Sequence, residues 1–170
     1  VVSEKLTLGE YLTERWLPDV RSPEGAGQAR YLDPVALATP PLALGNAARE
    51  AIRLADTVQD MLDGLLTVLR TNDTQLAESL RRRDDEIDRL YSAIKRYLAQ
   101  ISREALDANE ARRWTEIIQF TINLEHIGDI VERLLLDIAQ RKIQHKLSFS
   151  GAGMSEIGDL HARLTSNLQL

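Results

Sequence analysis

From about residue 42 onward, apolar side chains recur every three or four positions, which is the period of an amphipathic α-helix. Three successive segments carry one such stripe each, over residues 42–70, about 74–101 and about 110–145. Alternation of β-branched and polar residues, typical of strands, is scarce, and the sequence therefore predicts an all-α fold. The stripes consist of Ala51, Leu54, Val58, Met61, Leu62, Leu65 and Leu69; Leu76, Leu80, Ile87, Leu90, Tyr91, Ile94, Leu98 and Ile101; and Trp114, Ile117, Phe120, Leu124, Ile127, Val131, Leu135 and Ile138.

The breaks between these stripes are short. Residues 71–73 separate the first two segments, and either Asn72 or Asp73 is expected to cap the second helix, with Gln75 completing an approximate capping box. Residues 106–109 are expected to form the next turn. Short connections make consecutive helices antiparallel neighbours, so residues 42–146 are predicted to form an antiparallel up-down three-helix bundle.

The two flanking segments differ in composition from this bundle. All five prolines precede residue 42, so residues 1–41 are predicted to hold a short helix around residues 8–16 and an extended linker. Residues 147–170 are predicted to be a linker and the start of a fourth helix, with Ile157, Leu160 and Leu164 on its apolar stripe. Such an incomplete second unit leaves apolar surface uncovered, and we expect it to dock on the bundle or to mediate self-association.

Composition narrows the classes of function. Hydrophobic residues make up 44% and charged residues 28% of the chain, as in an ordinary folded protein. The absence of cysteine excludes disulfides, thiolate metal sites and cysteine nucleophiles. A net charge of −5 argues against nucleic acid as the main partner, and no apolar stretch is long enough to span a bilayer. The chain begins Val1-Val2 without an initiator methionine, so we expect a piece of a longer protein.

The candidate chemistry lies in two pairs of acids. Asp84 and Asp88 in the second helix, and Glu125 and Asp129 in the third, are each four residues apart, which places the paired carboxylates about 5–6 Å from one another on one face. Helical-wheel positions put both pairs beside the apolar stripes, so they are expected to converge between adjoining helices. The pair Asp56 and Asp60 has the same spacing but lies opposite its stripe and is predicted to be solvated surface.

Like charges at this spacing repel unless a cation neutralises them, and all-oxygen ligation suits Mg²⁺, Ca²⁺, Mn²⁺ or iron. The alternative is that the arginines at 81–83 and 89 hold these acids in surface salt bridges. A ferritin-like metal enzyme is a further alternative, but no histidine has a glutamate three residues before it, and His126 is more simply a surface residue. Motifs of proteases, nucleotide-binding enzymes and hydrolases are absent, so no enzymatic activity is expected.

The two acidic blocks resemble the metal-binding motifs of the PhoU family of phosphate-signalling proteins. They are Arg83-Asp84-Asp85-Glu86-Ile87-Asp88-Arg89-Leu90 and Asn123-Leu124-Glu125-His126-Ile127-Gly128-Asp129, about forty residues apart. The resemblance covers roughly residues 42–146 and implies three-helix repeats with a metal ion, divalent or ferric, bound at Asp84, Asp88, Glu125 and Asp129. In the segment that would begin a second repeat, Ser155 stands where the first acid should be, so no metal is assigned there.

The segment from Arg30 to Glu50 resembles the junction of a branch in which a PhoU-like domain is fused to a sodium/phosphate cotransporter. This resemblance implies a regulatory domain on the cytoplasmic side of the inner or plasma membrane that modulates phosphate uptake, with the membrane transporter portion or a phosphate-signalling protein as its partner. The alternative is a stand-alone PhoU-type adaptor that regulates a phosphate ABC transporter and its sensor kinase.

Overall fold

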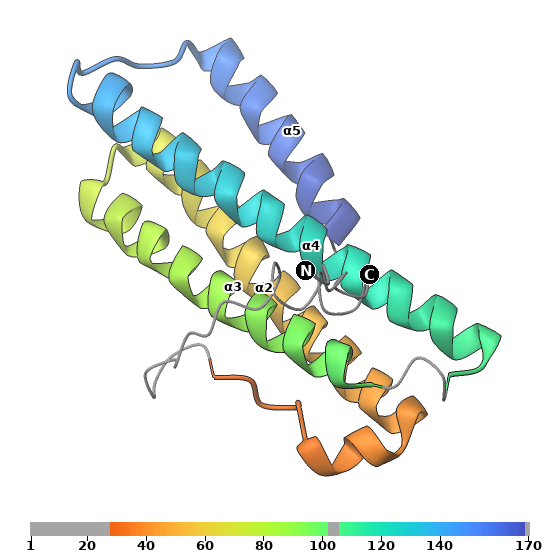
Figure 1. Ribbon diagram of the computed structural model, residues 1–170. Coiled ribbons are helices and arrows are strands. Elements are labelled where there is room, and N and C mark those ends of the chain that lie inside the picture. Colours follow the sequence, from red (N-terminus) through yellow and green to blue (C-terminus); the bar gives the residue numbers. More distant parts are fainter. Residues whose placement is uncertain (1–27, 102–105, 169–170) are drawn as a thin grey trace, which may run out of the picture.

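The computed structural model describes residues 28–101 and 106–168, and this part of the chain is all-helical, without strands. Four helices pack against one another (Figure 1). The helix expected around residues 8–16 lies outside the described residues. In chain order the elements are the 3₁₀ helix η1 (Pro34–Ala38), α2 (Pro40–Thr71), α3 (Thr74–Gln100), α4 (Ala108–Asp137), the π-helical turn η3 (Ile138–Ile143) and α5 (Gly151–Leu168).

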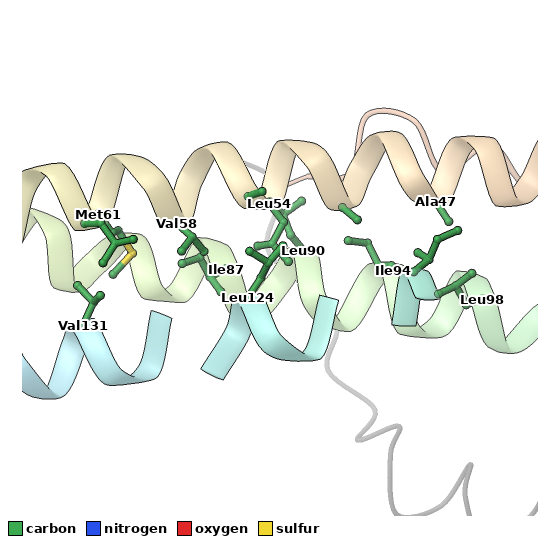
Figure 2. Close-up of a cluster of buried hydrophobic side chains, with 14 of the residues drawn as sticks. Ala47, Leu54, Val58, Met61, Ile87, Leu90, Ile94, Leu98, Leu124 and Val131 are labelled. Carbon is green, nitrogen blue, oxygen red and sulfur yellow. The ribbon is translucent and has the colours of Figure 1, made fainter. Parts of the chain in front are cut away.

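The core lies where α2, α3 and α4 meet. Leu54 and Val58 of α2, Ile87 and Leu90 of α3, and Leu124 of α4 are among its buried side chains (Figure 2). Each fully buried side chain of this size stabilises the fold by about 1.5–3 kcal/mol relative to an exposed one. These residues belong to the three predicted stripes, so the predicted three-helix bundle is confirmed.

Polar residues cap the helices and fix where α2 ends and where α3 and α4 begin. Asn72 adopts a left-handed conformation, with φ 58°, and ends α2, while the Asp73 side chain accepts hydrogen bonds from the backbone N–H groups of Gln75 and Leu76, both at 2.9 Å. Of the two expected caps, Asp73 is therefore the one that starts α3. A capping box between Asp107 and Glu110 starts α4 at Ala108, so the expected turn at residues 106–109 ends earlier than predicted.

The segment before α2 is not the extended linker that the prolines suggested. Glu50 of α2 is fully buried, and its carboxylate accepts hydrogen bonds from the backbone N–H groups of Arg30 and Tyr31, both at 2.8 Å. The hydroxyl of Tyr97 donates to the backbone carbonyl of Asp33 at 2.7 Å. Residues 30–38 are consequently packed onto α2 and α3, and α2 itself starts at Pro40, where a proline is tolerated in the first turn.

The predicted fourth helix is α5, and Gly151 and Gly153 lie in its first turn. This helix docks on α2, where His161 Nε2 lies 3.0 Å from Asp63 Oδ1, so the expected docking on the bundle is confirmed. No described residue of α5 is buried, and Leu160 and Leu164 remain exposed. The expected self-association stays a prediction.

Candidate functional site

The two acidic motifs face each other across the contact between α3 and α4. Asp84 and Asp88 of α3 interact electrostatically with Asp129 of α4, and Asp88 also interacts with Glu125. The fold therefore brings all four predicted site residues to one side of the bundle, where antiparallel helices place the motif of one beside the motif of the other. We call these four residues together with Glu132 the acidic face.

A glycine sets the distance between the two helices at this point. A Cβ atom added to Gly128 of α4 would lie 3.0 Å from Ile87 Cδ1 and 3.1 Å from Asp84 Oδ1. Both separations are tighter than ordinary van der Waals contact, so the missing side chain permits the close approach. Asp84 thus packs its carboxylate directly against the backbone of α4.

The carboxyl groups of the acidic face are harder to ionise than free ones, as the raised pKa values of three of them show. Asp84 is half-buried, and this burial is the main reason why its pKa rises to about 6, with Asp88, Glu132 and Asp129 adding repulsion. Loss of solvent also raises the pKa values of Asp88 and Glu125, and in both cases Asp129 is the carboxylate that contributes most to the repulsion. Each of these shifts disfavours the ionised form, which a bound cation would favour.

One oxygen of the acidic face has no partner. Asp84 Oδ1 is buried and makes no hydrogen bond within the described chain. The neighbouring arginines of α3 do not neutralise it, because Arg81 pairs with Glu78 and Glu132, and Arg83 pairs with Asp60. In the described parts of the chain Asp84, Asp88 and Asp129 form no ion pair, whereas Glu125 lies 3.7 Å from His126, and the charge of Arg89 partly offsets the raised pKa of Asp88.

Three further residues at this site were not predicted from the sequence. Glu132 Oε1 lies 3.6 Å from a guanidinium nitrogen of Arg81. The ammonium group of Lys95 donates to the Tyr91 hydroxyl at 3.2 Å and lies 4.3 Å from the centre of the Tyr91 ring. The available signal was spacing: Glu132 follows Asp129 by three residues and Tyr91 follows Asp88 by three, which keeps each on the face of its motif.

The oxygen atoms of the acidic face are of the kind that hard cations prefer, but their present positions do not form a complete metal site. All its donors are carboxylate oxygens, and the unpartnered Asp84 oxygen is available as a ligand. As the described side chains stand, no three His, Cys, Asp or Glu residues are placed to hold one metal ion together. A metal ion would therefore require the carboxylates to rotate toward one another.

The other candidates lie on the surface. His126 has a 65% exposed side chain, and its Nε2 atom is 3.7 Å from Glu125 Oε2, beside the site rather than within it. Asp56 is exposed, and Asp60 is exposed and paired with Arg83 at 2.8 Å. The prediction that Asp56 and Asp60 form a solvated pair is confirmed.

Comparison with known proteins identifies the family. The family model of the PhoU domain matches residues 51–138, just over half of the chain and the part that contains both acidic motifs. The chain belongs to the PhoU domain family. No solved structure gives a significant match.

The curated relatives of this PhoU domain carry the name "Putative inorganic phosphate export protein YjbB". This chain is 43% identical to the protein of Salmonella typhimurium and 45% identical to those of Escherichia coli and Shigella flexneri. Each match extends over 141 residues, which is 83% of this chain. The matched region covers 26% of each relative and corresponds to their C-terminal part. Neither the family nor the relatives' name indicates a catalytic function.

One expectation changes in the light of these relatives. Their name specifies export of phosphate, whereas the sequence suggested modulation of uptake. The relatives therefore give no support to uptake as the direction of transport. None of the described helices of this chain is long and apolar enough to cross a membrane. The membrane transporter portion expected as a partner stays a prediction.

Proposed function

We propose that this PhoU domain is a metal-binding regulatory domain that controls phosphate transport by a membrane portion to which it is joined. The single observation that carries the proposal is the acidic face between α3 and α4, with its unpartnered Asp84 oxygen. Phosphate transport is proposed as the process because the domain is related to the C-terminal part of proteins named for phosphate export. It would act on the cytoplasmic side of the membrane, and export is the direction that the relatives' name favours.

The acidic face supplies the features that a sensor of hard cations needs. Asp84, Asp88, Glu125 and Asp129 would hold the ion, and Mg²⁺, Ca²⁺, Mn²⁺ and iron suit this oxygen donor set. The four carboxylates repel one another when no metal is bound, and a bound metal ion would relieve this repulsion. Metal binding would therefore favour close approach of α3 and α4. A change at this contact reaches the bundle core directly, because Ile87 lies beside Asp84 and against Gly128.

The test is transport by the full-length protein that contains this domain. Radiolabelled phosphate flux is measured in both directions in cells that express the wild type or a variant with Asp84, Asp88, Glu125 and Asp129 replaced by Asn or Gln. We expect the quadruple variant to be present at the wild-type level but to change export at least about threefold, because cation control is lost. The matched control replaces Asp56 and Asp60 by Asn, and its flux should equal that of the wild type. Equal flux in all three proteins would refute the regulatory role.

A further inference from the structure

Basic residues collect in one segment of this acidic chain. Residues 138–155, which run from η3 into the start of α5, contain Arg141, Lys142 and Lys146 and no acid. The whole chain has 21 basic and 26 acidic residues, so without these three the rest has 18 basic residues against 26 acids. Lys142 binds Asn72, which places the segment at the end of the bundle where α2 meets α3 (Figure 1). The segment is therefore opposite in charge to the rest of the chain.

The connection between η3 and α5 also exposes apolar side chains. Residues 144–150 are all exposed, and among them Leu147 is 56% and Phe149 is 48% exposed. Lys146 directly precedes Leu147, so basic and apolar groups are neighbours on one exposed stretch. This combination is typical of segments that bind the surface of an anionic bilayer, where basic groups meet the lipid phosphates and apolar groups enter the boundary of the acyl chains.

Contacts from below hold this connection in one shape. The backbone N–H of Leu147 donates to the carbonyl of Lys142 at 2.8 Å, and that of Lys146 donates to the carbonyl of Ile143 at 3.1 Å. The buried side chain of Lys142 binds the Asn72 side chain, and its ammonium group lies 5.7 Å from the centre of the Phe149 ring. Leu147 and Phe149 are therefore fixed at the end of the bundle.

The backbone of Lys146 is a separate indication that its charge matters. Its φ is 54°, in the left-handed region where the residue after a helix is usually Gly or Asn. A side chain with a Cβ is disfavoured in this conformation, so the turn by itself would favour glycine. What the lysine adds at this exposed position is a positive charge.

The acids at this end of the bundle already have partners. Asp137 lies 3.7 Å from Arg141, and the two side chains are 61% and 80% exposed. Asp73 accepts hydrogen bonds from the backbone at the start of α3. Lys146 forms no ion pair within residues 28–101 and 106–168, so its charge is available to a partner.

We propose that the η3–α5 connection is a docking surface for an anionic lipid bilayer, with Arg141 and Lys146 at the lipid phosphates and Leu147 and Phe149 in the interface. This inference does not rest on the acidic face and needs no metal. Each basic group close to an anionic surface strengthens binding about fivefold, so the contact is weak and reversible. In a domain joined to a membrane portion, as the proposed function has it, such a contact would orient the bundle on the bilayer.

The test is sedimentation of the full 170-residue chain with lipid vesicles at low salt, with chelator present. One set of vesicles is phosphatidylcholine alone, and the other contains about 40% phosphatidylglycerol. We expect the chain to bind the anionic vesicles only, although its net charge of −5 opposes this. About 0.5 M salt should release it, because exposed charges are then screened.

A charge variant and its matched control locate the contact. Replacing Arg141 and Lys146 by Gln should lower the affinity for the anionic vesicles at least about tenfold. The control replaces the exposed Arg112 and Arg113 by Gln, near the start of α4 and far from its η3 end. It changes the net charge by the same amount, and its affinity should stay within about twofold of the wild type.

An apolar variant tests insertion independently of charge. Replacing Leu147 and Phe149 by Ser should lower the affinity at least about threefold, because the apolar groups no longer enter the interface. Circular dichroism checks that each variant keeps its helices. If the Ser variant does not fold, the charge variant, whose substituted side chains are exposed, still decides the question.

Three results would overturn the inference. The wild type could bind neither kind of vesicle, or both equally. The Arg112 and Arg113 control could lose as much affinity as the Arg141 and Lys146 variant, which would make the effect one of net charge. The charge variant could also bind as the wild type does. None of these results bears on the acidic face, so the proposed function is decided separately by its flux measurement.

Discussion

At the scale of single residues, the most informative side chain is Asp84, whose carboxylate lies against the backbone of Gly128 and has one oxygen without a partner. Its raised pKa means that the folded protein binds a proton more tightly than the unfolded chain does. The stability gained from this proton is fully present below about pH 4, the ordinary range of an aspartate, and is lost as the pH rises through about 6.

Replacement of Asp84 by Asn tests this linkage in the presence of chelator. The amide mimics the protonated acid, so at about pH 7.5 the variant should have a larger free energy of unfolding than the wild type. The difference should shrink as the pH falls from about 6 toward about 4, because the wild type then regains its proton. Urea unfolding across this range is the measurement. A difference that does not vary with pH would contradict the assigned electrostatics.

Glu50 provides a second prediction at this scale. It is fully buried, forms an ion pair with Arg53 and accepts two backbone hydrogen bonds from the segment before α2. Glu50→Ala should therefore lower the free energy of unfolding by about 3 kcal/mol, because two backbone donors lose their buried acceptor and the half-buried guanidinium of Arg53 loses its nearest carboxylate. Glu78, which is exposed and paired with Arg81, serves as the control, and Glu78→Ala should cost less than about 0.5 kcal/mol. Similar losses for both variants would contradict the anchoring role of Glu50.

The residue scale also shows what the sequence could and could not predict. The placement of four carboxylates on one side of the bundle could be predicted because it depends on helical period alone; they are those of Asp84, Asp88, Glu125 and Asp129. Glu50 was missed because its burial depends on backbone groups twenty and nineteen residues away, at Arg30 and Tyr31.

At the scale of elements, the lengths and directions of α2, α3 and α4 followed from apolar periodicity and short connections. The fourth helix was predicted from its apolar stripe, and Gly151 and Gly153 lie in its first turn. The proline-rich segment was misleading. Prolines predict a break in a helix, but they do not predict whether the broken segment packs on the bundle.

The approach of α3 to α4 can be tested by comparing two helical glycines. Gly45 of α2 has open space where a Cβ would lie, so Gly45→Ala should stabilise the fold by about 0.5–1 kcal/mol through helix propensity alone. Gly128→Ala gains the same propensity but crowds Ile87 and Asp84, so its effect should be at least about 1 kcal/mol less favourable. Urea unfolding of both variants gives the comparison. Equal effects would mean that the helices are not in close contact at Gly128.

At the scale of the whole molecule, the bundle holds repelling carboxylates on opposing helices, and a cation bound between them would relieve this repulsion. An ion that binds only the folded form at a hundred times its dissociation constant stabilises that form by about 2.7 kcal/mol. For a chain of this size, this corresponds to a rise of roughly 5–11 °C in melting temperature.

The most direct test is the melting temperature of the chelator-treated chain before and after addition of Mg²⁺, Ca²⁺, Mn²⁺ or iron. We expect a rise in the wild type and in the Asp56→Asn, Asp60→Asn control. The variant with Asp84, Asp88, Glu125 and Asp129 replaced by Asn or Gln should show no rise and should be at least as stable as the metal-free wild type. A rise of equal size in all three proteins, or no rise in the wild type with any of these ions, would contradict a metal site at the acidic face.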